Sequence, residues 1–573
     1  MRRPLLLAAM VALCATPLVG APSAGAAVSA RSASAPTAQI QGTGSTWAEN
    51  AINQWIKDVE SKNLQVVYTG SGSAQGRTDF RNDVTDFGVS DIGFQGYDPS
   101  TGNNDTNCQN PNPRSKCRAY AYLPIVAGGT SFPYQVRVGG QLIKNLRLSG
   151  KTIAKIFTGQ ITNWDDPEIA SDNNHFPDLP GHKLPSIKIT PVVDSQGSGA
   201  SAQFTAYLAA QYPAIWRQYS GLSGATEYFP RKGNTAEPGS DGIINYITSA
   251  AGEGSIGYDE YSYAQQQNWP VALLENKAGY FVAPTQYNVA VALTKAQINM
   301  QKSSPNYLLQ KLGNVYTNPD KRTYAMSSYS YMIIPTSGSD HQMGRQAAPK
   351  AQTLAEYIDW AVCGGQSEMG PIGYSPLPIN LAQASFEQMY KLHTADPKVQ
   401  IKQLNIATKC HNPTFWAGHS PSANYLAHIA PEPPACDKVG QGPCSGSVGV
   451  GVTGNPHNGK PPAPAPSSSG SGSTNPSGSS SASGSTSASP GASSAAVPGA
   501  SGATVPGSSS GTYGSGTVAG VPTSIAESDN GNISGVLAVL AAAEVLLMLA
   551  IPPIVMRRRR QRDSARPPRG GAA

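Results

Sequence analysis

The chain has 573 residues, of which only 13% are charged, and it contains 60 glycines and 47 prolines. This length allows several domains and a large apolar core, but the composition indicates that part of the chain is not globular. The formal net charge of +6 arises after Met556, where seven arginines are offset by Asp563 alone. The rest of the chain is neutral, so it offers no basic face, and we expect no nucleic-acid partner.

The first residues predict export. Arg2 and Arg3 precede an apolar run over residues 5–13, and small residues follow up to Ala24-Gly25-Ala26. This is the order of a secretory signal and its cleavage site. Residues 1–26 are therefore predicted to be a signal peptide.

A second apolar segment near the other end predicts a membrane anchor. Residues 533–556 are almost uncharged and would span about 36 Å as a helix, enough to cross a bilayer. Four arginines follow directly, and positive charge marks the cytoplasmic side. We therefore expect a single-pass protein of the cell membrane with one C-terminal transmembrane helix, an extracellular body and a basic cytoplasmic tail at 557–573.

A low-complexity stretch precedes the predicted anchor. No charged residue occurs from 461 to 526, and Ser, Gly, Pro, Ala and Thr make up nearly all of it. Such a segment cannot bury enough apolar surface to offset its ordering entropy. Residues 437–532 are therefore predicted to form a disordered stalk.

Six cysteines remain after the signal peptide, and an even number in an exported chain indicates disulfides. The spacing favours the pairs Cys108–Cys117 and Cys436–Cys444, which leaves Cys363–Cys410. No Cys-x-x-Cys pair or histidine cluster suggests zinc. We expect no metal and no cofactor.

The body, residues 38–434, alternates helical and strand-like segments. Apolar residues at helical spacing over 48–59 precede a strand at 65–68, a Gly/Ser turn, a helix at 74–81 and a strand at 87–89. The same order of strand, Gly/Ser turn and helix recurs after 187–193. This pattern predicts an α/β fold with parallel strands.

Motifs of common exported hydrolases are absent from the body. The glycine that a G-x-S-x-G elbow needs before Ser198 is replaced by Gln196. Gly150-Lys151-Thr152 resembles the end of a P-loop, but Asn145 stands where the loop needs glycine. We therefore predict that the chain is not an enzyme.

Three Gly/Ser turns stand before predicted helices, at residues 42–47, 70–73 and 197–200. Each is weak evidence alone, because Gly and Ser are common in turns. A helix N-terminus, however, presents unpaired N–H groups to anions. Together the turns predict hydroxyl and amide donors that converge on an anion in a cleft.

The motifs around these turns resemble the PstS family, the extracytoplasmic phosphate-binding proteins of the phosphate ABC transporter. The matching segments keep the family's order; they are Gly42-Thr43-Gly44-Ser45-Thr46-Trp47, Val67 to Ser73, Val84 to Asp91, Leu148 to Trp164, Gly254-Ser255-Ile256-Gly257-Tyr258 and Tyr329 to Ile334. The resemblance implies a two-lobe, type II periplasmic-binding-protein-like fold with the ligand cleft between the lobes.

The resemblance also implies a ligand site. Its contacts would be the hydroxyls of Thr46 and Ser73, the backbone N–H of Trp47, the carboxylate of Asp91, and Ser198, Gly199 and Ala200 at a helix N-terminus. A carboxylate that can only accept hydrogen bonds requires a protonated ligand, which admits phosphate and rejects sulfate.

One position departs from the family. Asp194 stands where the family has an arginine, Gln196 replaces its acidic neighbour, and Ala200 replaces a threonine. Loss of a guanidinium beside a second carboxylate should weaken the binding of a dianion. Alternatively, Asp194 points away from the site, or Arg77 or Arg231 supplies the missing cation.

Two functions therefore stay open. The first is a membrane-tethered solute-binding protein that binds phosphate or a related oxyanion and passes it to an ABC permease in the membrane. The second is a cell-surface sensory or interaction ectodomain that kept the fold and changed or lost its ligand. Asp194 favours the second function, whereas Thr46, Ser73, Asp91 and Ser198 favour the first.

Overall fold

The computed structural model describes residues 37–96, 105, 118–337, 347–402 and 405–444. The predicted signal peptide, the predicted Cys108–Cys117 pair, the stalk beyond 444, the transmembrane helix and the tail lie outside these residues. Among the described residues, no helix is both long enough and apolar enough to cross a membrane.

A six-stranded sheet forms the centre of the first lobe, with the strand order β11-β4-β16-β3-β1-β2. Its strands are β1 (Ile40–Gly44), β2 (Val66–Gly70), β3 (Phe87–Ser90), β4 (Tyr120–Ser131), β11 (Asp259–Glu260) and β16 (Ser327–Pro335). β1 is parallel to β2 and β3, as predicted. The long β16, however, is antiparallel to both β3 and β4, so the sheet contains antiparallel pairs besides the predicted parallel strands.

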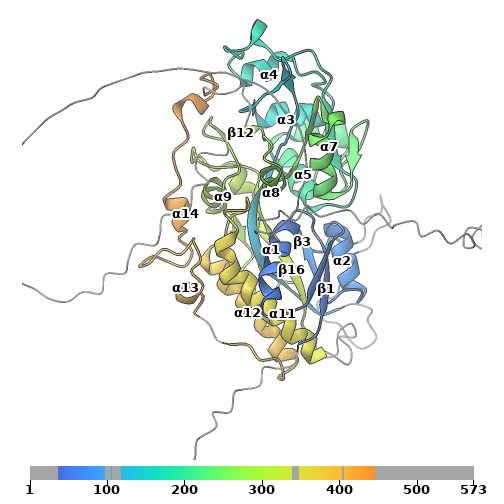
Figure 1. Ribbon diagram of the computed structural model, residues 1–573, viewed down its shortest axis with the longest axis vertical. Helices are drawn as coiled ribbons and strands as arrows, with labels where there is room; N and C mark the ends of the chain where they lie inside the picture. The colour runs from blue at the N-terminus through green and yellow to red at the C-terminus, as the bar shows by residue number, and fades with distance from the viewer. Residues whose placement is uncertain (1–36, 97–104, 106–117, 338–346, 403–404, 445–573) are drawn as a thin grey trace, which may run out of the picture. The chain divides into compact units, whose positions relative to one another are not determined.

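Helices cover this sheet: α1 (Glu49–Glu60), α2 (Ser73–Arg81), α11 (Ala347–Val362) and α12 (Ile379–Ala395) (Figure 1). The apolar spacing that predicts α1 is the spacing that it buries, with Ile52, Trp55 and Val59 in the core. α12 packs on β4, where the Ser385 hydroxyl donates to the Pro124 carbonyl at 2.6 Å.

The second lobe contains a parallel sheet with the order β10-β8-β9. Its elements are β8 (Thr190–Asp194), β9 (Thr235–Glu237), β10 (Ser255–Gly257), α3 (Gly150–Phe157), α4 (Pro167–Asp172), α5 (Gly199–Gln211), α6 (Pro213–Ser220) and α7 (Gly239–Thr248). Aromatic rings fill its interior, where Phe204 contacts Phe157, Phe229 and Tyr258.

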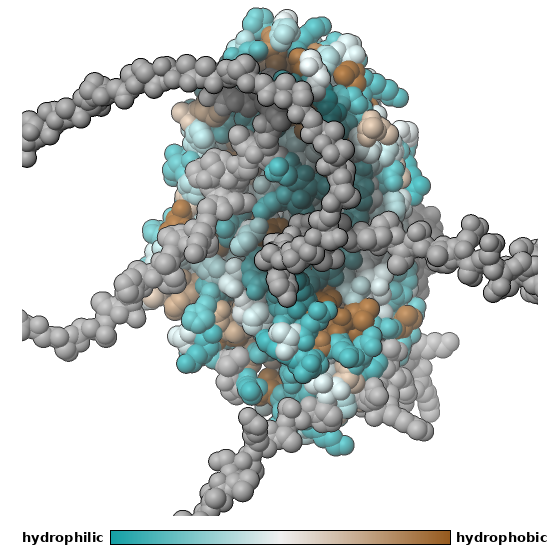
Figure 2. Space-filling model, in the orientation of Figure 1, coloured by the Kyte–Doolittle hydropathy of each residue, from teal (hydrophilic) through white to brown (hydrophobic). Residues whose placement is uncertain are grey.

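The remaining elements are short. They are β5 (Arg137–Val138), β6 (Gln141–Leu142), β7 (Arg147–Leu148), β12 (Leu273–Glu275), β13 (Phe281–Val282), β14 (Gln297–Ile298), β15 (Gln310–Lys311), α8 (Tyr261–Gln266), α9 (Gln286–Leu293), α10 (Gly313–Tyr316), α13 (Ile406–Lys409) and α14 (Tyr425–His428). The strands β13, β12 and β7 form a third sheet. In the face shown in Figure 2, apolar side chains occur in small separate areas of a mostly hydrophilic surface.

Two neighbouring segments join the lobes. β4 continues beyond Ser131 to Tyr134, which bridges to Ile256 in β10. The chain returns from β10 into β11, where Asp259 pairs with Ser131 of β4. Two crossover segments, which lie side by side, therefore join the lobes.

After α12 the chain runs back along the body as residues 405–444. Two predicted disulfides are confirmed, Cys363–Cys410 and Cys436–Cys444. Residues 437–444, which the sequence assigns to the start of the stalk, instead pack on the second lobe, where Asp437 forms an ion pair with Arg147.

Candidate functional site

The turn between β1 and α1 is held by three tyrosines. Tyrosine hydroxyls donate to three consecutive carbonyls: Tyr68 to Ser45 at 2.9 Å, Tyr263 to Thr46 at 2.5 Å and Tyr374 to Trp47 at 2.6 Å. The N–H groups of Thr46 and Trp47 have no acceptor among the described residues. The turn therefore presents two amide donors while its carbonyl oxygens are occupied.

Asp91 follows β3 and is 2% exposed. Its carboxylate accepts hydrogen bonds from the Ser45 hydroxyl at 2.8 Å and the Ser73 hydroxyl at 3.1 Å. A methyl group added at Gly199 would lie 2.1 Å from the Asp91 carboxylate, so the start of α5 touches it. Burial raises the pKa of Asp91, and the serine hydroxyls partly offset that rise.

The N-terminus of α5 comes from the second lobe. The Ser198 side chain caps the helix by accepting from the Ser201 N–H at 3.4 Å. The N–H groups of Gly199 and Ala200 have no acceptor among the described residues. This end of a 13-residue helix therefore supplies two unpaired donors beside Asp91.

The start of α7 also belongs to these contacts, although it was not among the three turns predicted from the sequence. The N–H of Ser240 donates to the Thr46 hydroxyl oxygen at 3.2 Å, and the N–H of Gly239 donates to Asp194 at 3.2 Å. Gly239 has a positive φ of 63° and leaves no room for a side chain beside Thr46. Pro238-Gly239-Ser240 is a fourth Gly/Ser turn before a helix, so the signal used for the other three could have found it.

Asp194 closes the contacts between these segments. It ends β8 and is 4% exposed, and its Oδ1 accepts from the N–H groups of Gln196 at 2.9 Å and Gly239. Burial raises the pKa of Asp194, and the hydrogen bonds from the N–H groups of Gln196 and Gly239 oppose this rise. Asp194 therefore faces the start of α7, where the next N–H group, that of Ser240, donates to Thr46.

Arg77 is not available to replace the missing cation. Its fully buried guanidinium binds Asp105 at 2.5 Å and Glu227 at 2.7 Å, and it also donates to Ser90. Burial alone would lower the pKa of Arg77, but the two carboxylates outweigh this and raise it. Because Glu227 belongs to the second lobe, this ion pair also joins the lobes.

Arg231, unlike Arg77, acts electrostatically on Asp194. Its guanidinium donates to the Ser195 carbonyl at 2.9 Å, and its charge lowers the pKa of Asp194 against the larger effect of burial. Arg231 is exposed, so water weakens this attraction. Of the two arginines named from the sequence, it is the one that acts on Asp194.

The structure thus brings the predicted site residues together from both lobes. Thr46 and Asp194 both accept hydrogen bonds from the start of α7. Gly199, at the start of α5, lies against Asp91, which accepts a hydrogen bond from Ser73. The lobes also touch directly, because the N–H of Ala74 donates to the Gly197 carbonyl at 3.0 Å.

Comparison with known proteins gives the family. Residues 30–365 match the model of the PBP superfamily domain. The phosphate-binding protein PstS 3 of Mycobacterium tuberculosis is 30% identical over 346 residues, which cover 59% of this chain and 82% of that protein. The chain belongs to the PstS family of the PBP superfamily.

A second curated relative also matches, and a solved structure resembles part of the chain. The phosphate-binding protein PstS of Methanocaldococcus jannaschii is 28% identical over 354 residues, covering 60% of this chain and 84% of the relative. A solved periplasmic phosphate-binding protein with bound phosphate, PfluDING, is 17% identical and covers 64% of this chain and all of that chain, with a TM-score of 0.45.

Glu49, at the start of α1, is a carboxyl group with an unusual pKa beside this PstS-family site. Its Oε1 accepts from the Gly70 N–H at 3.2 Å. Burial, and then the nearby charge of Asp241, raise the pKa of Glu49 from its ordinary value of 4.5 to about 7. The folded protein therefore holds a proton here that the unfolded chain releases above pH 4.5.

Glu49→Gln is expected to stabilise the protein at pH 8 by about 3 kcal/mol and to have little effect at pH 4. The reason is that the stability of the parent protein falls as pH rises from about 4.5 through about 7. Urea unfolding at both pH values measures this difference. The exposed Glu60 of the same helix gives the control, Glu60→Gln, and an equal gain in both variants would contradict the prediction.

Proposed function

We propose that the chain is an extracytoplasmic solute-binding protein that closes its two lobes on phosphate or a related small oxyanion and passes it to an ABC permease. The observation that carries this proposal is the convergence of unpaired N–H donors from both lobes beside Asp91. These donors are the amides of Thr46, Trp47, Gly199 and Ala200. Family membership and the names of the relatives support the same ligand.

Asp91 gives the proposed site its selectivity. A carboxylate accepts hydrogen bonds and cannot donate them, so it favours a ligand that carries a proton of its own. Phosphate carries such a proton at neutral pH, and sulfate does not. The two serine hydroxyls that already donate to Asp91 fix the direction in which it faces.

The predicted anchor completes the proposal. Export by the signal peptide at 1–26 would place the body outside the cytoplasm, and the apolar segment at 533–556 would hold it at the membrane that contains the permease. The Ser/Gly/Pro-rich residues between them would give the body reach.

A second function, a cell-surface sensory or interaction ectodomain, is favoured by the charges. Asp194 occupies the N–H donors of Gln196 and Gly239, which an anion would otherwise use. Arg77 is bound to Asp105 and Glu227. A phosphate dianion would therefore meet two carboxylates, and of the two arginines named from the sequence the exposed Arg231 is left to offset them.

Isothermal titration of the purified chain with phosphate and with sulfate at pH 7 tests the two functions. We expect saturable binding of one phosphate and no saturable binding of sulfate. Thr46→Val should weaken phosphate binding about tenfold, the equivalent of about one charge-assisted hydrogen bond. The matched control is Thr317→Val, which changes an exposed threonine far along the chain. A folded parent protein that binds no phosphate would favour the ectodomain.

A further inference from the structure

Residues 410–444 form a segment that contacts both lobes, and we call it the strap. It follows the region that matches the family model, which ends at residue 365. Figure 1 shows this orange segment along one side of the body, from α13 past α14 to the neighbourhood of β12. Three groups of contacts fix it.

The first group ties the strap to the first lobe. The disulfide Cys363–Cys410 joins its start to the end of α11. The side chains of Asn412 and Thr414 then both donate to the Leu377 carbonyl, at 3.0 and 2.9 Å. This end cannot leave the lobe without breaking a covalent bond.

The middle of the strap packs against α9, which lies against β4 and β16. A small apolar cluster forms there; its buried members are Tyr287, Ala290, Val291, Leu426, Ala427 and Ala430. The guanidinium of Arg322 donates to the carbonyls of Ala427 and Ala430, both at 3.2 Å. The strap is therefore seated along its length rather than only at its ends.

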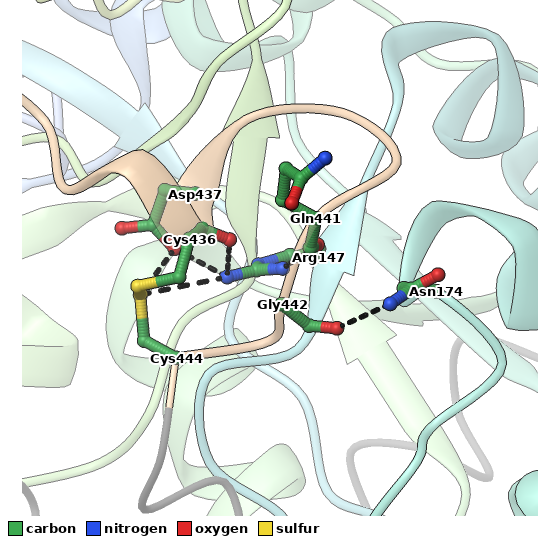
Figure 3. The surroundings of a disulfide bond; sticks show 7 residues. All are labelled: Arg147, Asn174, Cys436, Asp437, Gln441, Gly442 and Cys444. Carbon is green, nitrogen blue, oxygen red and sulfur yellow. Dashed lines mark hydrogen bonds and ion pairs between the residues drawn. A yellow bond between two sulfur atoms is a disulfide. The ribbon is translucent and has the colours of Figure 1, made fainter.

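The last group holds the strap to the second lobe through Arg147 of β7 (Figure 3). This fully buried arginine donates to the carbonyls of Cys436 at 2.7 Å and Gln441 at 3.0 Å, and it forms an ion pair with Asp437 at 2.5 Å. The side chain of Asn174 donates to the Gly442 carbonyl at 2.9 Å. The disulfide Cys436–Cys444 closes the loop that surrounds the guanidinium.

A segment fixed to both lobes must bend or detach whenever the lobes move apart about the crossovers near Ser131 and Asp259. The closed arrangement also depends on hydrogen bonds between the lobes, from the N–H of Ala74 to Gly197 and from the N–H of Ser240 to Thr46. We propose that the strap restrains opening of the cleft and that its attachment to Arg147 is the releasable end. The inference is independent of which ligand the cleft binds.

Hydrogen exchange of the full-length chain without ligand tests this proposal. The amides of Ala74 and Ser240 exchange only when the bonds between the lobes break, so they report opening. In Asp437→Ala we expect them to exchange at least tenfold faster than in the parent protein, while amides of β16 such as Met332 stay unchanged. Lys438→Ala, in the same loop, is the matched control and should behave like the parent protein.

A second variant guards against general destabilisation by Asp437→Ala. A protease site inserted after Glu432, an exposed residue between the contacts with α9 and Cys436, allows the strap to be cut after folding; the control carries the site in the exposed Gly139-Gly140 turn. Cutting the strap should speed exchange at Ala74 and Ser240 alone. Exchange within twofold of the uncut chain, or an equal increase in β16, would overturn the proposal.

Discussion

Replacing Arg77 with methionine is expected to lower the unfolding free energy by about 3 to 5 kcal/mol. The substitution removes the guanidinium that Asp105 and Glu227 share, and both carboxylates are almost completely buried. Removing one partner of a buried ion pair costs far more than the pair itself contributes, because the remaining charge is stranded in a poorly solvated place. Urea unfolding at pH 7 measures the loss.

The control for this experiment is Arg217→Met, which removes an exposed arginine of α6 and should change stability by less than about 0.5 kcal/mol. Glu227→Gln separates the two roles of Arg77, since Arg77 keeps Asp105 but loses its charged partner in the second lobe. A loss below about 1 kcal/mol in Arg77→Met would show that water reaches the two carboxylates.

Asp194→Asn is expected to strengthen phosphate binding ten- to hundredfold at pH 8. Asparagine keeps the Oδ1 acceptor for the N–H groups of Gln196 and Gly239, so the turn should stay in place. It removes a negative charge that, at about 5 Å and an effective dielectric near 20, would cost a bound anion about 3 kcal/mol at most. Arginine is a poorer test, because it would also remove the acceptor.

The gain from Asp194→Asn should shrink as the pH falls. Burial raises the pKa of Asp194, so the parent protein becomes neutral at this position at a higher pH than an exposed aspartate would. Titrations of parent and variant at each pH cancel the ionisation of phosphate itself. Asp178→Asn, an exposed change in the second lobe, is the control, and equal affinities for parent and Asp194→Asn at pH 8 would contradict the charge argument.

Local patterns predicted much of the fold, whereas the family resemblance named the candidate site residues. The helices α1, α2 and α5 stand where apolar spacing and Gly/Ser turns indicated. Among the residues that the resemblance named, Ser73 donates a hydrogen bond to Asp91. The antiparallel direction of β4 and β16 was not predicted, because an apolar run indicates burial on both faces but carries no information about strand direction.

Long-range partners were also beyond the sequence. Arg77 stands in α2, but its partner Glu227 is 150 residues further along the chain, so only the folded structure shows that this arginine is unavailable to a ligand. Residues 437–444 contain two glycines and a proline and lead toward the low-complexity stretch. They nevertheless pack on the body, because Arg147, 290 residues before Asp437, binds Asp437. The composition of a segment does not show whether a distant residue binds it, as Arg147 binds Asp437.

The three tyrosine hydroxyls that bind the carbonyls of Ser45, Thr46 and Trp47 also bear on ligand selectivity. A turn whose carbonyls accept hydrogen bonds from tyrosine hydroxyls loses its conformational entropy when the protein folds. Binding a ligand then costs no further ordering of this turn. The same stiffness prevents the turn from adjusting to a ligand of another size. In the proposed ligand site this turn would therefore act as a fixed frame, and an oxyanion wider than phosphate would be rejected by geometry before its charge mattered.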